Sequence, residues 1–233
     1  MFENCHKLVV VSSTLKDEFK SKYTIDESNV IITPNAVNSS NISVDENLKK
    51  EVLNKYNLND KLVVGFVGSI AEWHGIENII LAIHELKSKH ENLRLLIVGG
   101  GERLDYFKNK TKELAVEHLV HFTDKVQSNL VFTYIDCMDV TVLPRTNDYM
   151  SPIKIFEYGV MNKVVVAPDV QSVRDVMENN VDGILIGEVL GDLSRAIDSL
   201  ILDRDKRNRF AQSFHDKVIS EHTWRKMADK VLT

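Results

Sequence analysis

Two neighbouring segments decide the fold of this chain: Asp139-Val140-Thr141-Val142-Leu143-Pro144 and Ser151-Pro152-Ile153-Lys154-Ile155-Phe156-Glu157-Tyr158. The first is an apolar run typical of a buried strand. The second begins with a serine, a favoured N-cap residue, and a proline, which the first turn of a helix tolerates. Together they predict a strand, a loop and a helix capped by Ser151.

The predicted helix start has the chemistry of an anion site. Backbone N–H groups and the positive end of the helix dipole favour a phosphate there. Lys154 and Glu157 are three residues apart and share a helical face, which offers a cation for phosphate beside a carboxylate for sugar hydroxyls. An ordinary surface ion pair fits the same two residues, and the octapeptide alone leaves both interpretations open.

Strands and helices alternate outward from this unit. Alternation of this kind indicates βαβ units, and apolar strands indicate helices on both faces, so we predict an α/β fold with a doubly wound, Rossmann-like parallel sheet. The predicted strands are residues 62–67, 93–98, 120–122, 140–143, 164–167 and 183–186, and the predicted helices are 76–87, 104–115, 130–137, 173–179 and two or three within 192–232.

Four loops rich in glycine or polar residues follow the predicted strands. Ligands bind beyond the carboxyl ends of the strands in sheets of this type. We therefore expect the four loops to form one shared site. They span residues 68–75, 99–102, 123–127 and 145–154.

The first sixty residues follow another pattern, with strands at 8–11 and 30–32, helices at 15–23 and 48–56, and a polar stretch at 39–47. We expect residues 1–47 to be the tail of a preceding domain and a linker. Residues 48–233 form the second predicted domain. The strands of such a remnant would leave an exposed edge through which the chain could dimerise.

Composition excludes several classes of protein. The chain has 233 residues and a net charge of −5, so it lacks a basic field for nucleic acid. No apolar run is long enough to span a bilayer, and residues 1–7 lack the apolar core of a signal peptide. Cys5 and Cys137 form no metal or redox spacing, which indicates a reducing, cytoplasmic compartment. We find no metal-ligand cluster, catalytic triad or P-loop and expect no metal and no cofactor.

Six motifs in order resemble the C-terminal half of retaining glycosyltransferases of the GT-B fold, the group called family 4. They cover nearly the whole chain, and six in register are far more specific than one glycine-rich turn. They stand here as Val10-Val11-Ser12 with Leu15-Lys16, Ile32-Thr33-Pro34-Asn35-Ala36-Val37, Val67-Gly68-Ser69-Ile70 with His74-Gly75, Leu96-Ile97-Val98-Gly99-Gly100-Gly101-Glu102, Val120-His121-Phe122-Thr123-Asp124-Lys125-Val126, and Leu143-Pro144 through Glu157-Tyr158.

The resemblance implies a role for each matching residue. Glu157 would bind ribose hydroxyls, Lys154 the donor diphosphate, and the turn at 123–126 the base. The catalytic candidates are Lys154, Arg145 and Glu157. The donor-binding candidates are Gly68, Ser69, His74, Gly75, Gly100, Thr123, Lys125, Val126, Asp148, Ser151, Pro152, Ile153, Lys154 and Glu157.

Three departures from the family pattern affect the expected site. Ser69 stands where the family has an arginine, His74 where it has a lysine, and Tyr149, next to Asp148, where it has a glutamate. Lys154 and Arg145 are candidate replacements for the missing cations. His74 is either a phosphate ligand, protonated beside an anion, or a plain surface histidine. We interpret the adjacent Trp73 as a packing residue rather than a sugar platform.

The resemblance implies the donor-binding domain of a glycosyltransferase, with a UDP-sugar as the expected donor. The acceptor, a glycan or glycolipid of cell-surface polysaccharide or glycolipid synthesis, would be held by a missing N-terminal domain, and the full protein could associate peripherally with the cytoplasmic membrane face. We expect this chain alone to be an inactive fragment, or less readily a natural split subunit. The alternatives are a non-catalytic nucleotide- or protein-binding Rossmann-like module, or part of a nucleotide-sugar epimerase of the same architecture.

Overall fold

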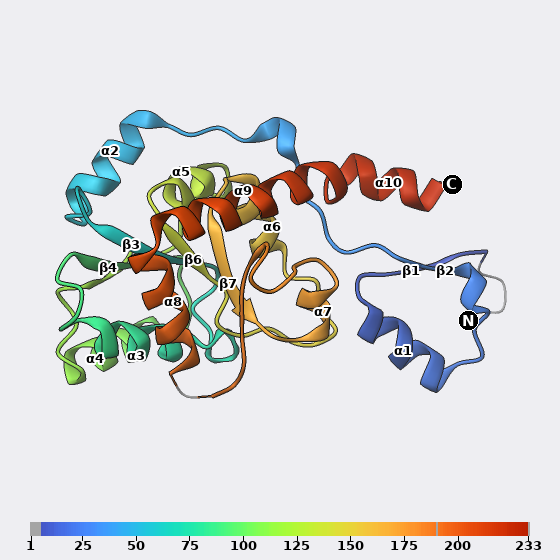
Figure 1. The fold of residues 1–233 in the computed structure, drawn as a ribbon, viewed down its shortest axis with the longest axis horizontal. Coiled ribbons are helices and arrows are strands. Elements are labelled where there is room, and N and C mark those ends of the chain that lie inside the picture. Colours follow the sequence, from blue (N-terminus) through green and yellow to red (C-terminus); the bar gives the residue numbers. More distant parts are fainter. Residues whose placement is uncertain (1–5, 190, 233) are drawn as a thin grey trace.

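The computed structural model describes residues 6–189 and 191–232 (Figure 1). Its main domain is built on a six-stranded sheet in the order β5-β4-β3-β6-β7-β8, and every neighbouring pair of these strands is parallel. This confirms the predicted doubly wound α/β fold. The strands are β3 (Leu62–Val67), β4 (Leu93–Val98), β5 (Val120–Phe122), β6 (Val140–Val142), β7 (Val164–Pro168) and β8 (Gly183–Ile186).

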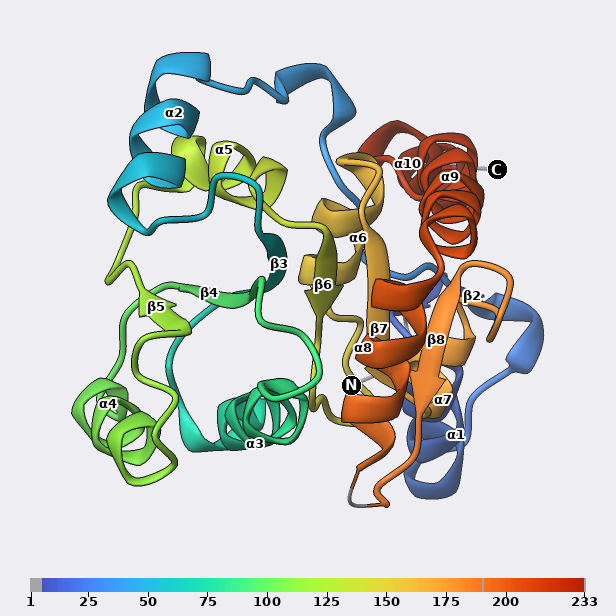
Figure 2. The same cartoon turned by 60° about the vertical axis from the view of Figure 1, so that its left-hand side comes forward.

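Helices cover both faces of the sheet, and Figure 2 shows α2 and α5 on one side of it and α3 and α4 on the other. Alternate strand residues point to opposite faces, so Val64 and Phe66 enter one core while Val63 and Val67 enter the other. One face packs on α3 (Ile76–Leu86), α4 (Leu104–Glu113) and α8 (Asp192–Leu202), the other on α2 (Glu46–Lys55), α5 (Val131–Asp136) and α6 (Ile153–Val160), and α9 (Arg204–Glu221) contributes to both cores.

The predicted helix at 173–179 is wrong in its position. The helix α7 (Gln171–Arg174) starts two residues earlier and is short. Its start is set by Asp148, whose Oδ1 accepts a hydrogen bond of 2.7 Å from the backbone N–H of Gln171. A cap supplied from 23 residues away leaves no local pattern in the sequence.

The N-terminal residues form a smaller unit beside the main domain, with β1 (Leu8–Val10) and β2 (Val30–Ile32) as a two-stranded parallel sheet packed on α1 (Ser13–Lys22). In Figure 1, α10 (Trp224–Leu232) extends from α9 toward this unit. A segment after β2 runs back along the main domain to α2. The division of the chain at residue 47 stays a prediction.

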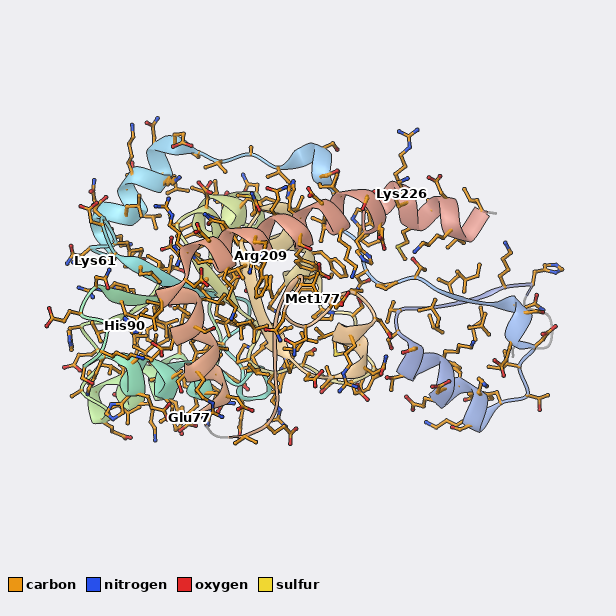
Figure 3. All side chains as sticks on the ribbon, viewed as in Figure 1. Lys61, Glu77, His90, Met177, Arg209 and Lys226 are labelled. Carbon is orange, nitrogen blue, oxygen red and sulfur yellow. The ribbon has the colours of Figure 1, made fainter. Side chains whose placement is uncertain are left out.

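Side chains fill the main domain densely in Figure 3, where Met177 lies in the interior and Lys226 projects from α10. Met177 is 2% exposed. Cys137 is a free, buried cysteine, and Cys5 lies outside the described residues. Within the described chain, no helix has both the length and the apolar character needed to cross a bilayer.

Candidate functional site

The candidate site lies where the strand order of the sheet reverses. The chain moves from β3 outward to β4 and β5, and then returns to place β6 on the other side of β3. A crevice forms beyond the carboxyl ends at such a switch point, because the loops after the two strands leave in opposite directions. Here these are the loop from Gly68 to Gly75 and the segment from Leu143 to Pro152.

Helix α6 begins at Ile153 rather than at Ser151, and Pro152 occupies the cap position without a side-chain hydrogen bond. The prediction that Ser151 caps the helix is therefore wrong. The Ser151 hydroxyl instead accepts a hydrogen bond of 2.9 Å from the backbone N–H of Asn35. With no side-chain cap from Pro152, the N–H groups of Ile153 and Lys154 remain available for an anion, while that of Ile155 donates to the carbonyl oxygen of Pro152 at 3.3 Å.

Lys154 lies across Gly68. A Cβ atom on Gly68 would be 2.3 Å from Cε of Lys154 and 3.1 Å from its Nζ, so only glycine leaves room for this side chain. The ammonium group also lies 5.9 Å from the centroid of the Phe66 ring. Burial lowers the pKa of Lys154 below its usual value, and the charge of Glu157 opposes this shift. The helix start therefore holds a half-buried cation.

Glu157 is half-buried one turn further along α6. Burial raises the pKa of its carboxyl group, and the positive charge of Lys154 opposes that shift. The next residue, Tyr158, is fully buried, and its hydroxyl oxygen accepts a hydrogen bond of 2.9 Å from the backbone N–H of Val67. Tyr158 thus joins α6 to the last residue of β3, directly before Gly68.

His74 is not a surface histidine in this structure. It is 2% exposed, and its Nε2 lies 3.0 Å from the hydroxyl oxygen of Ser69. Burial, reinforced by the positive charge of Lys154, lowers the pKa of His74 to about 4, so the ring is neutral at pH 7. Its Nδ1 is buried without a hydrogen-bond partner among the described residues.

Arg145 and Gly75 lie together at the start of α3. A Cβ atom on Gly75 would be 3.0 Å from Cβ of Arg145. Gly75 has the left-handed conformation, with φ of 69°, and no side chain caps the helix that it starts. Arg145 is exposed and follows β6, as the sequence predicts for a residue at the edge of the site.

The loops after β4 and β5 form the neighbouring part of the site. Gly99 packs so closely that a Cβ atom there would lie 2.0 Å from the carbonyl oxygen of Gly68. A Cβ atom on Gly100 would lie 3.3 Å from the backbone nitrogen of Lys125, and the hydroxyl of Thr123 accepts a 3.4 Å hydrogen bond from Gly99. Three of the predicted loops therefore meet, and Val126 packs partly buried behind them.

A cavity of about 230 Å³ opens between the loop after β3 and the segment that leads into α6, and the loops after β4 and β5 do not line it. His74, Arg145, Ser151, Pro152, Ile153 and Lys154 line it, which are six of the predicted site residues. Five further lining residues were not predicted as ligands: Asn35, Trp73, Leu143, Thr146 and Met150. Trp73 is 47% exposed, and its ring centroid lies 3.5 Å from that of His74.

A larger cavity of about 840 Å³ lies on the other side of the segment at 144–149. Four carboxylates line it, against Arg145 as its basic residue, so it is electrostatically unfavourable for a diphosphate. Asp148 belongs to this cavity and caps α7, and the structure does not bring it to Lys154. The four acidic residues are Glu85, Asp148, Asp169 and Glu188.

The described residues contain no group of three or more histidine, cysteine, aspartate or glutamate side chains arranged to hold a metal ion. Asn35 belongs to one of the six family-like motifs, but its contact with Ser151 could not be predicted from the sequence, because 116 residues separate the two. The exposure of Trp73 was equally hidden, since an aromatic residue in a loop more often packs into the core.

This chain is similar in sequence to a known family of proteins. The model of the family described as glycosyl transferases group 1 matches residues 48–215. An uncharacterised glycosyltransferase of Methanocaldococcus jannaschii is 23% identical over 99% of the chain and 60% of its own length. The capsular polysaccharide biosynthesis glycosyltransferase CapM of Staphylococcus aureus is 22% identical over 91% of the chain and 56% of its own length. The chain thus spans little more than half the length of these relatives.

Solved structures share the fold. Anabaena HepE in complex with UDP superposes with a TM-score of 0.86 over 97% of this chain and 62% of its own, at 16% identity. A glycosyltransferase from Rickettsia africae gives 0.84 over 99% of this chain and 64% of its own, at 18% identity. The C-terminal domain of the group 1 protein LpcC from Francisella tularensis gives 0.68 over 81% of this chain and 99% of its own, at 18% identity.

Proposed function

The chain belongs to the group 1 family of glycosyl transferases, and from this premise we propose that it is the part of a glycosyltransferase that binds a nucleoside-diphosphate sugar. One observation carries the proposal. The half-buried ammonium group of Lys154 lies over Gly68 beside the uncapped start of α6, at the switch point of the sheet. A half-buried cation next to the backbone N–H groups of a helix start suits a diphosphate better than any neutral ligand.

The proposed donor extends along the loops that meet at this point. Its diphosphate binds Lys154 and the first turn of α6, and Glu157 accepts hydrogen bonds from the ribose. The base lies against the turn containing Thr123, Lys125 and Val126. The cavity of about 230 Å³ is smaller than a whole nucleotide sugar and is proposed to take the sugar.

We propose a UDP-sugar as the donor. HepE, which shares the fold, has been solved in complex with UDP and with UDP-glucose. A relative from Mycobacterium tuberculosis, 21% identical, is a GDP-mannose-dependent mannosyltransferase, so the base has to be tested directly. No metal or other cofactor is part of the proposal.

In the proposed reaction the bond between the sugar and the diphosphate breaks, and negative charge grows on the departing phosphate oxygens. Lys154, Arg145 and the N-terminus of α6 stabilise that charge more strongly than they stabilise the bound donor. The neutral ring of His74 adds no charge. It orients the hydroxyl of Ser69, which stands near the same phosphates.

The rest of the proposal concerns a longer protein. An N-terminal domain would hold the acceptor, a glycan or glycolipid in cell-surface polysaccharide or glycolipid synthesis, and transfer would retain the configuration at the sugar carbon. The full protein would act in the cytoplasm, at the membrane face. This chain alone would bind donor and transfer nothing, because the acceptor side of the cleft is needed for the chemistry.

The proposal is tested by calorimetric titration of this chain with UDP, GDP and ADP. We expect UDP to bind, and both Lys154→Ala and Glu157→Ala to weaken it by about tenfold or more, since each removes a charge-assisted hydrogen bond. Lys50→Ala, at an exposed lysine of α2, is the matched control and should bind as the unsubstituted chain does. Absence of binding by all three nucleotides would overturn the proposal.

A non-catalytic nucleotide-binding module is the second candidate. It is favoured by Ser69, whose hydroxyl is engaged by His74, and by Tyr149, whose side chain supplies no carboxylate where the family has a glutamate. The titration separates the two, because a transferase site should discriminate between UDP-glucose and UDP-galactose, whereas a module that reads only the nucleotide should bind both equally.

A further inference from the structure

Asn35 lies at the candidate site although it precedes the segment that matches the family model. It follows β2 and the buried Pro34, and it lines the cavity of about 230 Å³. Its backbone N–H donates a hydrogen bond of 2.9 Å to Oγ of Ser151, and its side-chain amide donates one of 2.6 Å to the carbonyl oxygen of Ser151. The segment after β2 thus binds Ser151 through both the main chain and the side chain of Asn35.

Through Ser151, these two hydrogen bonds connect Asn35 to the proposed donor site. Ser151 is 5% exposed and stands directly before Pro152, the cap position of α6, and three residues before Lys154. The cap residue Pro152 makes no side-chain hydrogen bond to α6. The two hydrogen bonds from Asn35 therefore fix the direction in which the first turn of α6 points.

The orientation of the Asn35 amide follows from its partner. The Ser151 carbonyl can only accept a hydrogen bond, so the atom at 2.6 Å from it is the amide nitrogen. Its second N–H and its amide oxygen make no further hydrogen bond to the part of the chain that the structure describes, and the residue is only half-buried. These groups remain free at the cavity.

We propose that Asn35 is a positioning residue for the diphosphate of the donor: it holds Ser151 so that the first turn of α6 and Lys154 converge on the phosphate farther from the ribose. This inference rests on the proposed function. It extends the donor site beyond residues 48–215 and ties donor binding to the segment that leads out of the N-terminal unit.

The test compares UDP with UMP, which keeps the base, the ribose and one phosphate. Asn35→Ala removes the side-chain hydrogen bond to the Ser151 carbonyl oxygen. Asn35→Asp keeps the size of the side chain but places a carboxylate oxygen next to that carbonyl oxygen. We expect both variants to weaken UDP binding by about tenfold, as the loss of the one side-chain hydrogen bond implies, and UMP binding by about twofold or less. Asn59→Ala, at an exposed asparagine in the loop before β3, is the control and should change neither affinity.

A double substitution shows whether Asn35 acts through α6. If it positions Lys154, the loss caused by Asn35→Ala should fall to about twofold or less in a Lys154→Ala background, because the group being positioned is absent. Equal losses for UDP and UMP, or full additivity with Lys154→Ala, would assign Asn35 a general structural role and overturn the inference while the proposed function stands. Failure of the unsubstituted chain to bind UDP would overturn both.

Discussion

The position of the Lys154 side chain depends on Gly68, a residue without a side chain. Its aliphatic stem occupies the space that a Cβ on Gly68 would fill, and its ammonium group faces the ring of Phe66. A glycine at this position lets a neighbouring group approach the backbone closely. In the structure the first group to need that space is the lysine. The two predicted site residues therefore depend on each other.

Gly68→Ala should displace Lys154 and reduce UDP affinity by about tenfold, comparable to losing one charge-assisted hydrogen bond. The reason is the contact of 2.3 Å that the new methyl group would make with Cε of Lys154. Calorimetric titration measures the affinity. Gly187→Ala is the matched control, since a Cβ there would meet only the flexible carboxylate of Asp192, at 3.0 Å. An unchanged affinity in Gly68→Ala would contradict this account of the site.

Helix α6 is held at two points by groups distant in sequence. Asn35 binds its start through Ser151, and the hydroxyl of Tyr158 binds the end of β3 through the N–H of Val67. Between these two points the helix carries Lys154, which lines the cavity, and Glu157 three residues further along. An element of eight residues has little stability of its own, so its direction depends on such contacts.

Tyr158→Phe should lower the free energy of unfolding by about 1–3 kcal/mol, because it leaves the buried N–H of Val67 without its acceptor. It should also weaken UDP binding, as the end of β3 leads directly into Gly68. Chemical denaturation and titration measure the two effects. Tyr56→Phe, at a hydroxyl for which the described residues offer no hydrogen bond, is the control. Equal stability of both variants would show that the Tyr158 bond contributes nothing.

The strands of this fold could be predicted from the sequence because each is a continuous apolar run. Such a run indicates a strand buried on both faces without any information about the segments that pack against it. That the four loops lie together could be predicted because parallel strands end at one edge of the sheet. Ser151 shows where this reasoning fails. A serine at this position favours an N-cap role, but the Ser151 hydroxyl instead accepts a hydrogen bond from the backbone N–H of Asn35, 116 residues away in the sequence. His74 fails similarly, because its burial depends on loops that meet only in the fold.

The two parts of the molecule are joined along the side where the candidate site lies. The hydroxyl of Ser12 donates to the carbonyl oxygen of Tyr149, and the N–H and hydroxyl of Ser13 bind the carboxylate of Asp175 at 2.7–2.9 Å. The segment after β2 meets the bend between α9 and α10, where the N–H of Val37 donates to the carbonyl oxygen of His222.

His222 makes this junction sensitive to pH. It is 5% exposed, its ring lies 5.1 Å from that of Phe156 in α6, and its Nε2 is buried without a partner among the described residues. Burial is the main cause that lowers its pKa from 6.5 to about 4. The charges of Lys217 and Lys230 act in the same direction, and those of Glu221 and Asp182 oppose it. A proton on this ring is therefore disfavoured in the folded chain.

The sign of the effect on stability follows from the two pKa values. Below pH 6.5 the unfolded chain takes up a proton on His222, while the folded chain does not until about pH 4, so acidification favours unfolding. At pH 5 this single group should cost about 2 kcal/mol of the stability present at pH 7 and above. His222→Gln, which cannot titrate, should reduce the loss between pH 7 and pH 5 by that amount in chemical denaturation. His118→Gln, at an exposed histidine, should leave the loss unchanged. Identical pH profiles for His222→Gln and the unsubstituted chain would mean that His222 is protonated as readily in the fold as out of it.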